Sequence, residues 1–354
     1  MHVLTLPSFA LESGDGFADV PVAYEAWGRL GADGRNAVVV CHALTGSADA
    51  ADWWAPLVGP GRVLDTDRYF VVCANVLGSP YGTLSPVSAD PATGRRYGRA
   101  FPVPTIRDTV RLHRRLLDAL GVRSVALAIG GSMGGMQVLE WGFETDGDGA
   151  PFVRALCPIA VGARHSAWCI AWSEAQRMAV AADPAWSGGD PHAATAGLAA
   201  ARAMAMISYR TAEAFAMRQG RAVNAAGPYA GALAAAAYLR HQGQKLIRRF
   251  DPVCYVRLTE MMDTHDIARG RSGSAGNDEA ALAAAFARLQ QPLLAIGIDS
   301  DVLYMPSEAR EVARLAPRGT YAELASPWGH DAFLIEFDAL DRLLRDWWDE
   351  ASSP

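Results

Sequence analysis

The side chain most able to do chemistry is Ser132, in the stretch GGSMGG at 130–135. The stretch fits the pattern Gly-x-Ser-x-Gly and lies between an apolar run, 124–131, and a segment of helical character. A serine on a sharp strand-to-helix turn exposes its hydroxyl, and small neighbours let the strand and the helix approach each other. The alternative, a phosphate-binding turn, is disfavoured because neither Gly-x-Gly-x-x-Gly nor Gly-x-x-x-x-Gly-Lys-Ser/Thr is present. Ser132 is therefore a candidate nucleophile.

A serine hydroxyl needs a base to take its proton and a carboxylate to orient that base. With this turn the serine comes first in the chain, followed by the acid and then the histidine. Of the eight histidines, only His330 follows a late strand-like segment, TYAELAS at 320–326, and precedes the last helical segment. His42 also lies at the end of a strand-like run, whereas His113 and His265 lie in helical patterns typical of packing or surface residues. We expect His330 to be the base.

Two aspartates could orient the histidine. Asp299 and Asp301 both follow the apolar run 292–298. Side chains two positions apart point to the same side of an extended chain, so their spacing alone does not separate them. We favour Asp301 because it lies deeper in the loop, and we expect Asp299 to be a structural turn residue.

Acyl chemistry also needs N–H groups that stabilise a developing oxyanion. The residue after the nucleophile usually supplies one N–H, and a loop after an early strand supplies another. Met133 is the first candidate. The loop CHALTG at 41–46 follows the first strong strand-like run, which makes Leu44 or Thr45 the second candidate.

The elements that would position these residues alternate in the first half of the chain. Apolar or β-branched runs bounded by turn residues predict buried strands at 36–44, 68–78, 124–131 and 153–162. Between the second and third of these runs, 105–121 repeats apolar residues at helical spacing and ends at a glycine. Strands that alternate with a helix indicate a parallel α/β sheet.

The character of the sequence changes from about residue 164 to 288. Alanine, arginine and methionine dominate this stretch, strand patterns disappear, and helix-forming residues fill long windows. We interpret it as an all-helical insertion, with a loop at GRSGSAGND, 270–278. Strand and helix patterns then return and end in one predicted amphipathic helix at 330–348. The predicted parts are a first core segment at 1–165, the helical insertion at 166–288 and a second core segment at 289–354.

Composition excludes several classes of function. The chain has 354 residues with 32 Lys and Arg against 38 Asp and Glu, a net charge of −6, and no basic run interleaved with aromatic residues, so nucleic acid is not an expected partner. The first residues do not resemble a secretion signal, and no long apolar run predicts a membrane span, so we expect a cytoplasmic protein. Five widely spaced cysteines are expected to be reduced and mostly buried, with no metal site.

Several blocks together, in order over nearly the whole chain, are similar to one known family. They are CHALTG, NVLG, GRRYG, FPVPTIRD, GGSMGGMQVLEW, ARHSAW, GIDSDVLY and SPWGHDAFLIE. The set resembles the homoserine O-acetyltransferase family, which has the α/β-hydrolase fold: a mostly parallel central sheet flanked by helices, here with an all-helical lid insertion. The segment SPYGTLSPVSADP at 79–91 departs from the pattern of many bacterial members, so this part of the pocket is expected to differ.

The resemblance implies acyl transfer from acetyl-CoA to the hydroxyl of L-homoserine by a ping-pong route, without a cofactor. Ser132, deprotonated by His330, would attack the thioester, and the N–H groups of Leu44 and Met133 would hold the oxyanion. Homoserine, activated by the same histidine, would then accept the acyl group. Asp301 would fix the imidazole tautomer.

The resemblance also implies a site for the acceptor amino acid. In the family, an Arg and a Tyr two helical turns apart, together with the Asp after the catalytic His, hold the amino acid; Arg202, Tyr209 and Asp331 match these positions. Without the resemblance, we would interpret Arg202 as an ordinary surface arginine. Family members pair as homodimers through the lid helices, and the apolar stretch 193–240 is compatible with such a face or with an internal core.

Three alternatives remain open from the sequence. Related enzymes use serine or deacetylcephalosporin C as acceptor, or succinyl-CoA as donor. An esterase or thioesterase would use the same three catalytic side chains. A non-catalytic scaffold on this fold would require one of them to be missing, and all three residue types are present in order.

Overall fold

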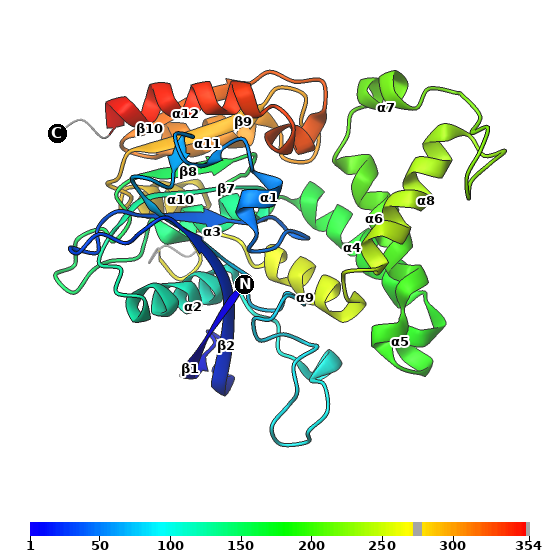
Figure 1. Ribbon diagram of the computed structural model, residues 1–354, viewed down its shortest axis with the longest axis horizontal. Helices are drawn as coiled ribbons and strands as arrows, with labels where there is room; N and C mark the ends of the chain where they lie inside the picture. The colour runs from blue at the N-terminus through cyan, green and yellow to red at the C-terminus, as the bar shows by residue number, and fades with distance from the viewer. Residues whose placement is uncertain (272–277, 352–354) are drawn as a thin grey trace.

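The computed structural model describes residues 1–271 and 278–351, and part of the predicted loop at 270–278 lies outside them. A twisted central sheet has helices on both faces, and a separate group of helices extends from one side of it (Figure 1). The strands are β1 (His2–Ala10), β2 (Gly16–Trp27), β3 (Ala37–Cys41), β4 (Val58–Gly59), β5 (Leu64–Asp65), β6 (Phe70–Ala74), β7 (Val125–Gly131), β8 (Leu156–Ile159), β9 (Leu293–Ile298) and β10 (Gly319–Leu324).

The helices of the described residues fall into a core group and an inserted group, and the same residues include three short 3₁₀ segments. Those of the core are α1 (Ala50–Trp53), α2 (Ile106–Ala119), α3 (Met133–Trp141), α11 (Pro306–Leu315) and α12 (Phe337–Ala351). Those between β8 and β9 are α4 (Ala167–Ala181), α5 (Pro184–Gly188), α6 (Thr195–Ser208), α7 (Ala212–Arg218), α8 (Ala234–Ile247), α9 (Pro252–Asp263) and α10 (Asp278–Phe286). The 3₁₀ segments are η1 (Gly98–Ala100), η2 (Pro191–Ala193) and η3 (Gly329–Leu334).

The sheet confirms the predicted fold class. Eight strands pair in the order β1-β2-β6-β3-β7-β8-β9-β10, and the six from β6 to β10 run parallel. The predicted strands are present but shorter than predicted. The range 36–44 contains β3, and the range 153–162 contains β8. The antiparallel pair β1 and β2 was not predicted. Exposed or partly exposed residues interrupt the buried ones along both strands, so they lack the continuous apolar run by which the inner strands were recognised.

Alternate residues of the inner strands supply two cores. Val39 of β3 packs in the larger core with α2, α3 and α11, whereas its neighbours Val38 and Val40 pack on the other face with α12. Burial on both faces explains the almost uninterrupted apolar runs of these strands. The carboxyl ends of β7 and β9 are thereby fixed rigidly, and the loops that follow them carry Ser132 and Asp301.

The helices between β8 and β9 form the predicted insertion and differ in how much they contact the core. Helices α4, α6 and α8 pack mainly on one another, to the side of the sheet in Figure 1. Helix α9 contributes Leu258 and Met261 to the larger core, and α10 contributes Phe286. We call α4 to α8 the lid; α9 contacts both α4 and α6 of the lid and the larger core.

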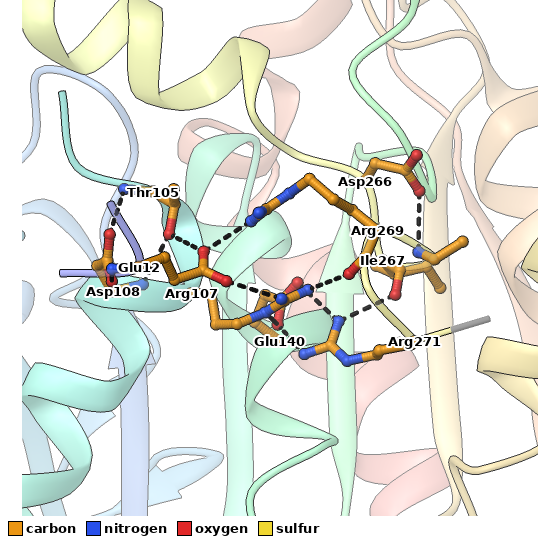
Figure 2. Close-up of polar contacts among 10 residues, drawn as sticks. Glu12, Thr105, Arg107, Asp108, Glu140, Asp266, Ile267, Arg269 and Arg271 are labelled. Atoms are coloured by element: carbon orange, nitrogen blue, oxygen red, sulfur yellow. Dashed lines mark hydrogen bonds and ion pairs between the residues drawn. The ribbon is translucent and has the colours of Figure 1, made fainter. Parts of the chain in front are cut away.

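A buried ion-pair network ties the segment after α9 to the core (Figure 2). The carboxylate of Glu140, 3% exposed on α3, pairs with Arg107 of α2 and with Arg271. Arg107 also contacts Glu12 at 2.8 Å, and Arg269 contacts the same glutamate at 2.7 Å. Charges in such surroundings are stable only while each has its partner. The network therefore links the β1–β2 hairpin, α2, α3 and the end of the insertion.

The last predicted helix, 330–348, is interrupted. Residues Gly329–Leu334 form η3, and α12 begins only at Phe337. Gly329 has a φ of +69°, which turns the chain sharply just before His330. The periodic apolar pattern continues through the break, which is why it suggested a single helix.

Two further features concern the whole described chain. All five cysteines are free and buried, as predicted. Within residues 1–271 and 278–351, no helix combines the length and the apolar character that a membrane span requires.

Candidate active site

Ser132 occupies a strained turn between β7 and α3. Its φ of 59° and ψ of −126° lie outside the regions that serine normally adopts. A Cβ at Gly134 would lie 2.1 Å from the carbonyl oxygen of Cys41, and one at Gly131 would lie 2.6 Å from the ring of Phe333. These glycines therefore permit close contact between the turn, strand β3 and the segment after His330.

The structure brings His330 together with Asp301. Nδ1 of the histidine lies 2.6 Å from Oδ2 of the aspartate, and both side chains are buried. The other carboxylate oxygen, Oδ1, accepts the backbone N–H groups of Leu303 at 2.8 Å and Tyr304 at 3.0 Å. This arrangement fixes the carboxylate and favours the tautomer whose proton is on Nδ1. Nε2 is then left as the acceptor for a proton.

Asp299 is engaged elsewhere. Its Oδ1 accepts the backbone N–H of Ser326 at 2.9 Å, which ties the end of β9 to the end of β10. It thus has the structural contact expected of a turn residue.

The Nε2 atom of His330 is buried and has no hydrogen-bond partner within the part of the chain that the structure describes. The ring lies between two tyrosines, with ring centroids 5.1 Å from Tyr304 and 5.6 Å from Tyr209. Burial lowers the pKa of His330, but the charge and the hydrogen bond of Asp301 outweigh it, so the pKa is raised overall. A histidine with a raised pKa and a free Nε2 in a cavity is suited to general base catalysis.

Tyr304 was not singled out from the sequence. It is almost fully buried, it stacks on His330, and its hydroxyl lies 3.1 Å from Nδ1 of His165. His165 belongs to the block ARHSAW and Tyr304 to the block GIDSDVLY. The contact between these two residues therefore joins the two blocks next to His330. The only sequence signal for a role of Tyr304 in the site is its position three residues after Asp301.

The proposed oxyanion donors come from two segments, the start of α3 and the loop after β3. Met133 is the first residue of α3, so its N–H is among those that have no acceptor within the helix. Leu44 and Thr45 both line the same cavity as Ser132. Neither of their N–H groups donates a hydrogen bond within the described parts of the chain, and the choice between them stays a prediction. The carbonyl of Thr45 accepts a hydrogen bond from Arg249 of the segment after α8, at 2.7 Å.

One cavity of about 940 Å³ connects the candidate residues. It is lined by side chains of the core loops and of the lid, among them Leu44, Ser132, Arg202, Tyr209, His330 and Asp331. Its volume is in the upper part of the range found for small-molecule sites, with room for more than one substrate group. Met133 is fully buried and is not among its lining residues.

The three residues expected to bind the acceptor all line this cavity, and a further residue, Arg210, contacts one of them. The Arg202 guanidinium lies 5.6 Å from the centre of the Tyr209 ring, at the end of α6. Asp331 has an ion-pair partner that the sequence did not suggest, because its Oδ2 lies 3.1 Å from the guanidinium of Arg210. Burial raises the pKa of Asp331, and Arg210, Arg202 and His330 oppose the rise.

The other histidines have structural contacts. His42 is fully buried, and its Nε2 accepts the backbone N–H of Val76 at 3.1 Å. Burial lowers its pKa to about 4, so it is neutral at pH 7. His113 and His265 each contact a backbone carbonyl within the core. No group of three or more potential metal ligands is found among residues 1–271 and 278–351.

Comparison with known proteins gives a consistent result. The alpha/beta hydrolase fold family matches residues 36–337. A homoserine O-acetyltransferase of Salinibacter ruber is 55% identical, over 98% of this chain and 97% of its own. One of Nostoc punctiforme is 49% identical, over 97% and 94%. Among solved structures, esterase E22 superimposes with a TM-score of 0.84 and 26% identity, over 98% of this chain and 99% of its own. The chain therefore belongs to the α/β-hydrolase fold family and, within it, to the homoserine O-acetyltransferases.

Proposed function

We propose that this protein transfers the acetyl group of acetyl-CoA to the hydroxyl of L-homoserine, a step toward methionine, without a cofactor. The observation that carries the proposal is a single cavity lined by Ser132, by His330, which Asp301 orients, and by two side chains of opposite charge, Arg202 and Asp331. The first set suits acyl transfer, and the second suits an amino acid with a carboxylate and an ammonium group. The names of the related proteins support the same substrates.

In the first half-reaction, Nε2 of His330 takes the proton of Ser132 as the hydroxyl attacks the thioester carbonyl. The N–H groups of Leu44 and Met133 stabilise the oxyanion of the tetrahedral intermediate. The carbonyl re-forms as the carbon–sulfur bond breaks, and His330 returns the proton to the CoA thiolate. The product of this half-reaction is an acetyl ester on Ser132.

In the second half-reaction, the acceptor hydroxyl replaces CoA. His330 removes the proton of that hydroxyl as its oxygen attacks the ester carbonyl, and then protonates Ser132 as this oxygen leaves. Arg202 and Tyr209 bind the acceptor carboxylate, and Asp331 binds its ammonium group. Because Asp331 directly follows His330, it holds the acceptor close to the base.

Transfer rather than hydrolysis requires that water be kept from the acetyl ester while the acceptor is in place. Ser132 is only 8% exposed and His330 only 3%, and the lid residues Arg202 and Tyr209 close part of the cavity above them. The second candidate function is an esterase, favoured by the structural likeness to esterase E22.

An activity panel of two donors and two acceptors tests the proposal. Acetyl-CoA with L-homoserine is expected to give the highest kcat/KM, ahead of acetyl-CoA with L-serine and of succinyl-CoA with either acceptor. A higher kcat/KM for L-serine would correct the acceptor, and a higher one for succinyl-CoA would correct the donor. Hydrolysis of simple acetyl esters faster than any transfer would favour the esterase.

We further propose a cytoplasmic homodimer that pairs through the lid. Large apolar side chains are exposed on the lid, and they include Ile207, Met217, Val223 and Leu233. Such a patch is typical of a protein–protein interface. Light scattering should give twice the chain mass, and Met217→Asp should shift the protein toward the monomer; a monomeric wild type would contradict the proposal.

A further inference from the structure

A second, smaller cavity lies beside the candidate active site and serves no step of the proposed reaction. It has a volume of about 340 Å³, near the lower limit for small-molecule sites. Its walls come from α7, α8 and the segments before and after His330, and they include Arg210, Phe215, Arg218, Tyr238 and Trp328. Neither Ser132 nor His330 lines it, so it is separate from the cavity of the reaction.

The charged side chains that line this second cavity are both arginines, Arg210 and Arg218. Its described lining contains no acidic side chain. The Arg218 guanidinium lies over the Trp328 ring, 4.7 Å from its centre, which holds the charge at the cavity wall. Nε of Arg210 is buried and has no hydrogen-bond partner among the described residues. The Tyr238 hydroxyl accepts a hydrogen bond from the Arg210 guanidinium, but Nε still lacks an acceptor, and a buried N–H donor without an acceptor is costly.

The remaining walls are flat or apolar. Phe215 and Tyr238 pack edge to face, with ring centroids 5.8 Å apart, and the Trp328 ring and Ile335 add further apolar surface. A bare inorganic anion would leave this surface uncovered. Two guanidinium groups beside aromatic rings fit a small carboxylate with an apolar body.

Arg210 connects the two cavities. Its guanidinium lines the second cavity, and it also pairs at 3.1 Å with Asp331, which lines the first. The surrounding chain is tightly packed: the hydroxyl of Thr211 donates to the carbonyl of Pro327 at 2.7 Å, and the N–H of Asp331 donates to the carbonyl of Tyr209 at 3.3 Å. A change in the charge around Arg210 therefore alters the strength of its ion pair with Asp331, whose members are only partly exposed.

We propose that this second cavity is a binding site for a small carboxylate with an apolar body, and that its occupancy weakens the hold of Arg210 on Asp331. The bound carboxylate accepts from Nε of Arg210 and from Arg218. Arg210 then shares its charge between two carboxylates, which leaves Asp331 freer to bind an ammonium group in the first cavity. By linkage, an ammonium group on Asp331 in turn favours binding of the carboxylate.

Titration calorimetry with benzoate tests binding without any substrate, and benzamide serves as the neutral analogue of equal shape. Benzoate is expected to bind about tenfold more tightly than benzamide and than inorganic phosphate, because it has both the charge and the ring. The variant Arg218→Gln should weaken benzoate binding about tenfold. Arg221→Gln removes an exposed arginine outside the cavity and should change nothing.

A further variant distinguishes binding in the second cavity from binding in the first, where benzoate could contact Arg202. The variant Arg202→Gln should bind benzoate as the wild type does. Loss of binding in Arg202→Gln but not in Arg218→Gln would place the carboxylate in the first cavity and overturn the proposal. Equal binding of benzoate and benzamide, or of benzoate and phosphate, would overturn it as well.

The coupling to Asp331 has a kinetic test that rests on the proposed function. Saturating benzoate should lower the KM for L-homoserine at least about twofold and leave the KM for acetyl-CoA unchanged, and Arg218→Gln should abolish this effect. An unchanged KM for L-homoserine with benzoate bound would overturn the coupling. If the protein has no transferase activity, the proposed function fails, while the calorimetric result still decides the second site.

Discussion

Asp301 Oδ2 lies 2.6 Å from Nδ1 of His330, whereas the carboxylate of Asp299, two residues earlier, accepts the N–H of Ser326 instead. The two aspartates therefore have different predicted effects. Asp301→Asn should lower kcat about 10⁴-fold, because an amide at this position favours the wrong imidazole tautomer. Asp299→Asn should cost less than about tenfold, since it only weakens one turn. Steady-state kinetics of both variants, with circular dichroism as a folding control, gives the ranking, and the opposite ranking would reverse our assignment.

The pH dependence follows from the same pair. The pKa of His330 is raised above its ordinary value of 6.5, although burial alone would lower it. His330 is active as a base only when neutral, so kcat/KM for acetyl-CoA should fall as the pH decreases through a pKa above 6.5. In Asp301→Asn, burial should dominate and move this acid limb to lower pH. A wild-type acid limb below pH 6.5 would contradict the assignment.

Much of this site follows from local sequence, and the rest depends on tertiary contacts. The turn at Ser132 has a local signature, because the glycines around it are required by close approach to Cys41 and Phe333. The pairing of His330 with one of two aspartates has no such signature. It is decided by how β9 and β10 end side by side, where Ser326 is within reach of Asp299.

Arg202 provides the test of acceptor recognition. Its guanidinium lines the main cavity next to Tyr209, and it has no carboxylate partner among the ion pairs of the described chain. Arg202→Gln should therefore raise the KM for L-homoserine about tenfold or more, with little effect on the KM for acetyl-CoA. Arg221→Gln, an exposed arginine outside this cavity, is the matched control. Equal increases for both substrates would mean that Arg202 supports the lid and does not contact the acceptor.

The ion-pair network of Figure 2 should dominate the response of stability to the loss of one charge. Glu140→Gln leaves Arg107 and Arg271 without their buried partner, which should reduce the free energy of unfolding by about 3–5 kcal/mol at pH 7. Glu323→Gln breaks an exposed pair with Arg310 and should cost less than about 1 kcal/mol. Urea unfolding measures both values. A loss for Glu140→Gln no larger than that for Glu323→Gln would show that the network adds little.

The sign of the pH dependence provides a second check on this network. Burial raises the pKa of Glu140, but Arg271 and Arg107 outweigh burial and lower it below its ordinary 4.5. Its contribution is therefore fully present above pH 4.5 and lost as the pH falls through the lower pKa of the folded state. The difference between wild type and Glu140→Gln should accordingly shrink in acid. A difference that grew in acid would contradict this account of Glu140.

The parts of the fold that the sequence did not reveal have a common physical cause. Strands β1 and β2 mix exposed and buried residues, so they lack the buried-strand pattern. The segment η3 continues the apolar period of α12 across a break, so its pattern resembles that of one long helix. Arg210 is adjacent to Tyr209 in sequence, yet its importance comes from Asp331 in η3, which is distant in the chain. Such contacts join segments that no local pattern connects.

The most direct test of the central claim is to mix the purified protein with acetyl-CoA and follow release of the CoA thiol with and without L-homoserine. We predict a burst of thiol close to one per active site without acceptor, an acetyl group on Ser132 by mass spectrometry, and continuous release only when L-homoserine is added. Ser132→Ala should show neither burst nor label. Continuous thiol release at the same rate without any acceptor would contradict the transferase and identify a hydrolase.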